Sequence, residues 1–477
     1  MPPSALNDGD SAVHYLTLTE VAALLESRQV SPVELAQHML ERIDQIDGRL
    51  KSYATVTADR ALAAARRAEQ EIAAGRYRGL LHGVPIAVKD LCFTKGTRTM
   101  GGLSVRRDFV PDHDATVVSR LEDQGAVLLG KLALTEGAMA GYHPDFPIPV
   151  NPWNEDYWSG ASSSGSGVAT AAGLCFAALG SDTGGSIRFP SMANGVVGLK
   201  PTYGLVSRHG ILPLSETLDH VGPMTRSTAD AAIVLQAMAG HDDSDPTSLA
   251  NPAPDLLRGL HAGISGARIG FDREYACEGI DAGLVASIEQ ALLVLSRLGA
   301  TIVDVQMPAG IKDIEPTWFA ICSAEAYAAH KATFPSRADE YGPHFRELLE
   351  MGAAITDEQY QAATQLRDQF SEQYEAVLGT VDAMVCPSGG LTFPVPPDLQ
   401  YGDTETLQPL FQAVQMYFTI PSDFSGTPAL TVPCGFSDSG LPYALQFVGA
   451  RLSEATLCRI GHAYEQASPW HDRHPQI

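Results

Sequence analysis

The feature of this sequence that most restricts its possible folds is the order of apolar and helical stretches along the chain. An apolar run at 84–89 (VPIAVK) precedes a helical pattern at 114–124, and a second apolar run follows at 126–131 (AVLLGK). The same alternation returns at 283–306, where a helical pattern leads through a Gly-Ala turn into a strand pattern. Strands that alternate with helices pack as a sheet covered by those helices. We therefore predict an α/β protein with a largely buried sheet.

The chain has 477 residues, a length that allows two or three domains. No internal repeat, low-complexity tract or interdomain linker divides it, so we expect one large domain. The segment 17–47 is predicted to be helical, with a capping box at 31–34 (SPVE), and a second helix covers 58–74. We expect this N-terminal helical segment, about 1–75, to pack on an α/β core formed by 76–477.

Charge and composition restrict which molecules this protein can bind and in which compartment it is expected. The formal net charge of −24 repels nucleic acid and anionic membrane surfaces. The first 16 residues lack the pattern of a secretory signal, and no apolar run reaches the roughly 18 residues of a membrane span. The seven cysteines are scattered without a C-x-x-C pair, as in proteins of a reducing compartment. We expect a cytoplasmic protein that binds neither nucleic acid nor membranes.

Several catalytic signatures are absent. The sequence has no G-x-S-x-G elbow, no serine three residues before a lysine, no H-E-x-x-H, no Walker-type loop and no G-x-G-x-x-G. The sequence therefore predicts neither a metal site nor a nucleotide cofactor.

Two Gly/Ser stretches remain as the candidate site. The first is 159–167 (SGASSSGSG) and the second is 181–186 (SDTGGS), with a helix expected between them at about 168–178. Each stretch alone is typical of a flexible linker or a helix-capping turn. Together they could converge at one end of the sheet, where the successive amides of Thr183, Gly184, Gly185 and Ser186 would form a nest for an oxyanion.

A serine nucleophile needs a base, and no histidine lies between His143 and His209. Lys89 ends the apolar run 84–89, and burial there would lower its pKa towards that of a useful base. The alternative is that Lys89 reaches solvent or pairs with Asp90.

The segments GVPIAVKD (83–90), GASSSGSG (160–167) and GSDTGGSIRFP (180–190), followed by 195–227, resemble the amidase signature family. The resemblance covers nearly the whole chain. It implies the amidase signature fold, a single domain in which a mixed central β-sheet is flanked on both faces by α-helices.

The family uses a Ser-cisSer-Lys triad, with the bridging serine 24 residues before the nucleophile. The resemblance therefore implies that Ser186 is the nucleophile, Ser162 the bridging serine and Lys89 the base, without a cofactor. It also implies a cis peptide between Ala161 and Ser162. Many members have Gly where this chain has Ala161.

The resemblance is compatible with two activities for this chain. The first is hydrolysis of small apolar acyl or aryl amides, with esters and carbamates (urethanes) as variants, by a monomer or homodimer. The alternative is the A subunit of a tRNA-dependent amidotransferase, which hydrolyses glutamine. That protein usually has Gln at the position of Phe189 and an acidic residue at that of Met416, so the sequence favours the free amidase.

The expected substrate pocket is apolar. We assign Phe189, Met416 and Tyr417 to it, together with Phe393 and the aromatic, Pro-rich segment 142–158, which reads as a surface wall or lid.

Overall fold

The computed structural model describes residues 13–477. The first twelve residues of the N-terminal segment, including most of the stretch considered as a signal, lie outside the described residues.

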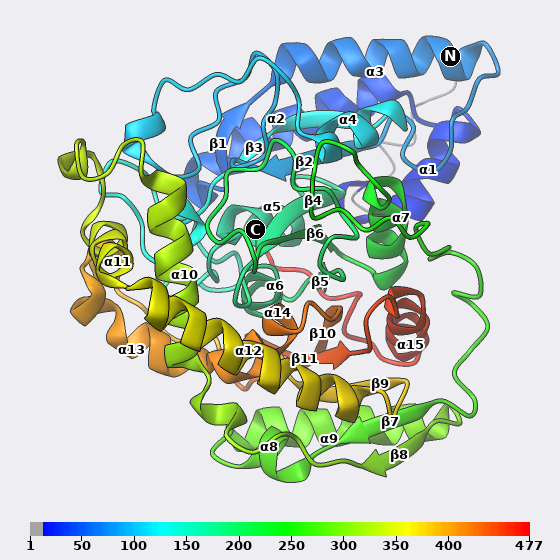
Figure 1. Cartoon of the computed structure of the whole chain (residues 1–477). Helices are drawn as coiled ribbons and strands as arrows, with labels where there is room; N and C mark the ends of the chain where they lie inside the picture. The colour runs from blue at the N-terminus through cyan, green and yellow to red at the C-terminus, as the bar shows by residue number, and fades with distance from the viewer. Residues whose placement is uncertain (1–12) are drawn as a thin grey trace.

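One mixed sheet forms the centre of the molecule (Figure 1). Its eleven strands run in the order β1-β3-β2-β4-β6-β5-β10-β11-β9-β7-β8. The strands are β1 (Tyr53–Val56), β2 (Pro85–Lys89), β3 (Val127–Leu132), β4 (Ala177–Asp182), β5 (Val197–Lys200), β6 (His220–Thr225), β7 (Arg268–Phe271), β8 (Thr301–Asp304), β9 (Ala383–Pro387), β10 (Ala429–Phe436) and β11 (Pro442–Val448). The trios β3-β2-β4 and β9-β7-β8 are parallel, and the strands from β4 to β9 are antiparallel.

Within residues 13–477, fifteen α-helices surround this sheet. They are α1 (Leu18–Glu26), α2 (Pro32–Leu50), α3 (Ala58–Ala73), α4 (Thr116–Asp123), α5 (Ser164–Ala171), α6 (Arg188–Asn194), α7 (Thr228–Met238), α8 (Arg273–Cys277), α9 (Ala282–Arg297), α10 (Glu315–His330), α11 (Pro343–Ala354), α12 (Asp357–Leu378), α13 (Thr404–Val414), α14 (Ile420–Phe424) and α15 (Glu454–Gln466). None of these helices has the length and apolar character needed to cross a membrane.

The helices cover both faces of the sheet, as predicted. The helices α4, α7, α15 and α9 touch in series, and α7, α15 and α9 pack on the strands from β4 to β11. The connections β2–α4–β3 and β3–α5–β4 run in opposite directions along the sheet, so right-handed crossovers place α5 on the other face. The helices α10, α11 and α13 gather at one side of the sheet, away from α1 to α4 (Figure 1).

The predicted alternation of strands and helices is confirmed in most places. The strand expected at 84–89 is β2, that at 126–131 is β3, and the pattern at 283–306 is α9 followed by β8. The N-terminal segment differs from a purely helical one, because β1 pairs antiparallel with β3 at the edge of the sheet.

The helix predicted at about 168–178 is wrong in position. The helix α5 begins at Ser164 and ends at Ala171, and residues 177 and 178 belong to β4. Gly173, with φ +65°, closes the helix early. The serines tolerate helical backbone because their hydroxyls bond to distant groups: Ser166 Oγ donates to the Leu179 carbonyl at 2.8 Å.

The capping box at 31–34 is confirmed and gives a stability test. Ser31 Oγ accepts from the amides of Val33 and Glu34, and the Glu34 carboxylate accepts from the Ser31 amide. Ser31→Ala should lower the unfolding free energy by about 1 kcal/mol, read from the midpoint of urea denaturation at unchanged m. Ser453 is the matched control, because it stands at the start of α15 and its hydroxyl has no partner within the described structure. An equal loss in Ser453→Ala would contradict the role assigned to the cap.

Candidate active site

The two Gly/Ser stretches meet where the strands β2 and β4 end. These strands are parallel neighbours, so Lys89 at the carboxyl end of β2 and the loop 183–186 after β4 lie at the same end of the strands. The carboxyl ends of parallel strands are where α/β proteins bind ligands. The Ser163 amide donates to the Ser186 carbonyl at 3.2 Å, which ties the first stretch to the second.

The amine of Lys89 is buried among hydroxyls. Its Nζ lies 2.7 Å from Ser162 Oγ, 2.8 Å from Ser163 Oγ and 2.9 Å from Ser181 Oγ. The lysine has no exposed surface. The peptide bond between Ala161 and Ser162 is cis, as the family resemblance implies.

Burial is the main cause of the low pKa of Lys89. It lowers this pKa to about 7, although Cys92, Asp182 and Asp219 act in the opposite direction. The alternative that Lys89 pairs with Asp90 is excluded, because the Asp90 carboxylate lies 3.3 Å from the Lys131 amine. The pKa prediction for Lys89 therefore agrees with its surroundings.

The loop that carries Ser186 is fixed by a buried ion pair. Asp182 accepts hydrogen bonds from the amides of Gly185 (2.6 Å) and Ile187 (3.0 Å) and pairs with the guanidinium of Arg188 at 2.9 Å. Burial raises the pKa of Asp182, but the Arg188 charge outweighs it and holds that pKa well below the usual range. Ser186 is the one residue of 181–190 that is partly exposed, and the others are buried.

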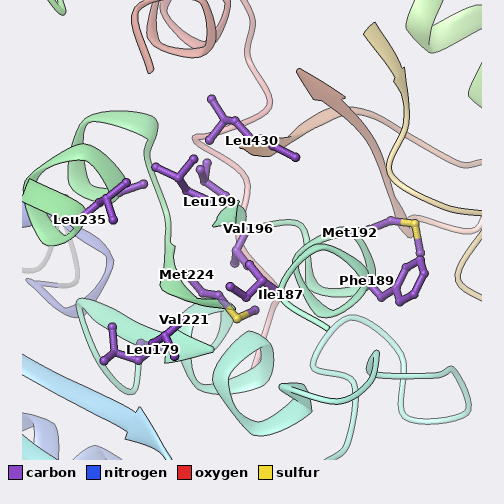
Figure 2. Packing of buried hydrophobic residues seen from close by; sticks show 14 of the residues in the cluster. Leu179, Ile187, Phe189, Met192, Val196, Leu199, Val221, Met224, Leu235 and Leu430 are labelled. Carbon is purple, nitrogen blue, oxygen red and sulfur yellow. The ribbon is translucent and has the colours of Figure 1, made fainter. Parts of the chain in front are cut away.

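Gly185 needs to be glycine for two reasons. Its φ is +129°, and a Cβ there would lie 2.4 Å from the ring of Phe189. Phe189 stands at the start of α6, on the opposite side from Ile187, which packs beside Met224 (Figure 2). The glycine thus lets the loop turn tightly over an aromatic ring.

The predicted oxyanion nest needs one correction. The amide of Gly185 donates to Asp182, so it is not free to bind an oxyanion. No hydrogen bond within residues 13–477 occupies the amides of Thr183, Gly184 or Ser186. The nest is reduced to these three donors.

A narrow apolar pocket opens over Ser186. The space free of atoms between its lining residues, open solvent at the mouth included, is about 410 Å³. Its other lining residues come from six segments: Ala138, Met139, Ala140, Trp158, Ala161, Thr183, Gly184, Phe189, Leu214, Trp318, Leu410, Phe411, Val414 and Met416.

Two of the three residues assigned to the substrate pocket line it. Phe189 and Met416 do, but Tyr417 does not. The ring of Tyr417 lies 4.5 Å from that of Phe418 and 5.9 Å from the Lys312 amine, and neither Phe418 nor Lys312 lines the pocket. Met416 and Tyr417 are adjacent in the short helical turn Met416–Phe418, where successive side chains are rotated by about 120°, and this rotation turns Tyr417 out of the pocket.

The aromatic segment 142–158 takes part in the wall only through Trp158. Its ring stacks on Phe393 at 5.4 Å. Tyr142 is buried elsewhere and donates to Ser164 Oγ at 2.7 Å.

Sequence reasoning missed four groups around this site. Ser163 and Ser181 share the lysine amine with Ser162, and the runs SSS and GSD were their only signals. Trp318 on α10 and Phe411 on α13 also line the pocket, although each is more than 130 residues from Ser186 in the sequence. Nothing local to either aromatic residue marks it.

The family follows from comparison with known proteins. The family model described as Amidase matches residues 34–458. A protein of Mycobacterium bovis named "Putative amidase AmiD" is 44% identical over 479 residues, which cover 98% of this chain and 97% of that protein. The chain therefore belongs to the amidase signature family and is an amidohydrolase that acts on linear amides.

Two further relatives show the range of the family. The A subunit of the Glutamyl-tRNA(Gln) amidotransferase of Thermosynechococcus vestitus is 39% identical, with 96% of this chain and 99% of that protein covered. The native peptide amidase of Stenotrophomonas maltophilia has a solved structure with a TM-score of 0.82 and 33% identity, covering 97% of this chain and 98% of that one.

The low pKa of Lys89 makes a prediction about stability that does not depend on activity. In the unfolded chain a lysine is charged up to about pH 10.4, whereas folded Lys89 loses its proton near pH 7. Between these values the unfolded state binds the extra proton, so folded stability rises with pH by up to about 1.4 kcal/mol per unit. Lys89→Met should lack this contribution. We expect the unfolding free energy of wild type, measured relative to that of the variant, to increase from pH 7 to pH 9. A constant difference would show that folded Lys89 keeps an ordinary pKa.

Proposed function

We propose that this chain is a free-standing amidase for small amides with an apolar acyl or aryl group, and that Ser186, Ser162 and Lys89 form its catalytic triad. The observation that carries the proposal is the buried Lys89 amine, 2.7 Å from Ser162 Oγ, in a stretch whose Ser163 amide donates at 3.2 Å to the carbonyl of Ser186, a partly buried residue of the apolar pocket. A lysine with a pKa near 7 is neutral enough to act as a base at neutral pH.

The hydroxyls around Lys89 support a direction for proton transfer. Ser163 Oγ donates to the Ser181 carbonyl at 3.2 Å, so towards Lys89 it acts as an acceptor. A neutral amine has two N–H donors and one lone pair. Lys89 can therefore donate to Ser163 and Ser181 and accept the hydroxyl proton of Ser162.

The reaction then proceeds through an ester. Ser186 Oγ attacks the amide carbonyl while its proton passes to Ser162, and the Ser162 proton passes to Lys89. The amides of Thr183, Gly184 and Ser186 are the proposed donors to the oxyanion. The C–N bond breaks as the amine leaves with the proton returned by the same path. Water attacks the acyl-enzyme by the reverse relay, releasing the carboxylic acid and restoring Ser186.

The pocket supports an apolar substrate over glutamine. Phe189 and Met416 both line it; the Phe189 side chain has no hydrogen-bonding atom, and the Met416 thioether is only a weak acceptor for a glutamine headgroup. A pocket with apolar walls discriminates against a polar side chain, because the amide of a bound glutamine would lose its hydrogen bonds to water and gain none from the protein. The name of the Mycobacterium relative agrees with a free amidase, and glutamine hydrolysis within a tRNA-dependent amidotransferase is the alternative.

Ser186→Ala tests the nucleophile. Purified wild type should hydrolyse members of a panel of anilides, primary amides and aryl carbamates, with little activity on glutamine. Ser186→Ala should lose more than about 99% of that turnover, because loss of a covalent nucleophile removes the acyl-enzyme path. Its thermal unfolding midpoint should match wild type. Turnover retained above a few per cent would remove Ser186 from the nucleophile role, and glutamine as the best substrate would favour the amidotransferase alternative.

Lys89 should control the pH dependence. Wild-type kcat/KM should rise from acid pH and level off above about pH 7, as the Lys89 amine loses its proton. Lys89→Ala should cut kcat/KM by about 10²–10⁴-fold and flatten the rise. Lys89→Arg is the matched charged variant and should not restore activity, since guanidinium stays protonated at any working pH. A Lys89→Ala enzyme with the wild-type profile would assign the ionisation to another group.

A further inference from the structure

We propose that Trp318 is a positioning residue of the oxyanion site, acting through the Thr183 carbonyl. This inference rests on the proposed function. The indole Nε1 donates to the Thr183 carbonyl at 2.8 Å, and Trp318 is 2% exposed. Trp318 lies on α10, more than 130 residues from the loop in the numbering. The bond therefore joins the oxyanion loop to a helix outside the two Gly/Ser stretches.

The direction of this bond decides what it does. The Thr183 carbonyl and the Gly184 amide belong to one peptide unit, which is not among the cis bonds of the described residues. In a trans peptide the C=O and N–H groups point in opposite directions. By holding the carbonyl, the indole aims the Gly184 N–H away from itself. That amide is one of the three free donors of the nest.

The neighbouring peptide unit is held independently. Thr419 Oγ1 donates to the Gly184 carbonyl at 2.6 Å, and the Gly185 amide of the same unit donates to Asp182. The Thr183 hydroxyl donates to Asp219 at 2.7 Å. Both sides of the 183–184 peptide are thus fixed, and the indole supplies the one bond to its carbonyl within the described structure.

Contact between the indole and the loop is also close. A Cβ on Gly184 would lie 2.7 Å from Cζ2 and 2.9 Å from Cε2 of Trp318. The ring edge therefore rests directly on Gly184, while the ring itself lines the pocket. An acyl group bound in the pocket would contact the same indole ring that holds the Thr183 carbonyl. Through Trp318, the fit of the acyl group therefore affects the orientation of the Gly184 amide, the proposed oxyanion donor.

Trp318→Phe is the test, because it keeps an aromatic wall and removes the N–H. With an anilide substrate we expect kcat to fall about 10–100-fold, below the loss for deleting an oxyanion donor itself, and KM to change less than about threefold. Affinity for a trifluoromethyl ketone, whose adduct with Ser186 carries an oxyanion, should fall by the same factor as kcat. Affinity for a product-like carboxylic acid should not.

Trp153→Phe is the matched control. Its Nε1 donates to the Asn194 carbonyl, also at 2.8 Å, in a cleft away from Ser186. Removing this bond should leave kcat and the ketone affinity within about twofold. If Trp318→Phe does not fold, β-(3-benzothienyl)alanine at position 318 keeps the ring shape without the donor.

The outcomes separate the two proposals. Unchanged kcat and ketone affinity in Trp318→Phe, with Ser186→Ala inactive, would overturn the positioning role and leave the proposed function intact. A parallel loss of ketone and acid affinity would also overturn it, because Trp318 would then act as a wall alone. An active Ser186→Ala enzyme would overturn the proposed function, whatever the Trp318 variant does.

Discussion

The buried amine of Lys89 is the constraint on which the rest of the site depends. A charged ammonium without a carboxylate partner is costly in an apolar interior, so the fold surrounds the amine with three hydroxyls and lowers its pKa to about 7. Those hydroxyls come from the two residues that precede α5 and from the end of β4. The parallel pairing of β2 with β4 places Lys89 next to these hydroxyls, so the environment of the amine depends on this sheet order.

A second buried network holds the loop that carries Ser186 against the C-terminal third of the chain. Arg188 pairs with Asp182 inside the loop and, at 2.7 Å, with Asp423 on α14. The same guanidinium donates to the Thr419 carbonyl at 2.9 Å. All four groups are buried. A bidentate, fully bonded arginine of this kind fixes geometry more than it adds stability, and removing one partner would leave a buried charge.

Local patterns in the sequence predicted the elements that make the site, and distant packing decided what they could not. The capping box, β2 ending at Lys89 and the two Gly/Ser stretches are local signals, and the structure has each. The start of α5 was misplaced because serine helix propensity was overridden by tertiary hydrogen bonds. Trp318 carries no local mark, since its role comes from a contact with Thr183 that only folding creates.

The ionisation of Lys89 is the quantity that tests the account most directly. The chain has seven lysines, so [13C]ε-lysine labelling gives a small set of Cε–Hε resonances, and Lys89→Arg identifies one of them. We expect that resonance to titrate near pH 7, with the amine neutral above it. A Lys89 resonance that keeps its charged shift up to pH 10 would contradict the claim that a neutral, buried lysine is the base.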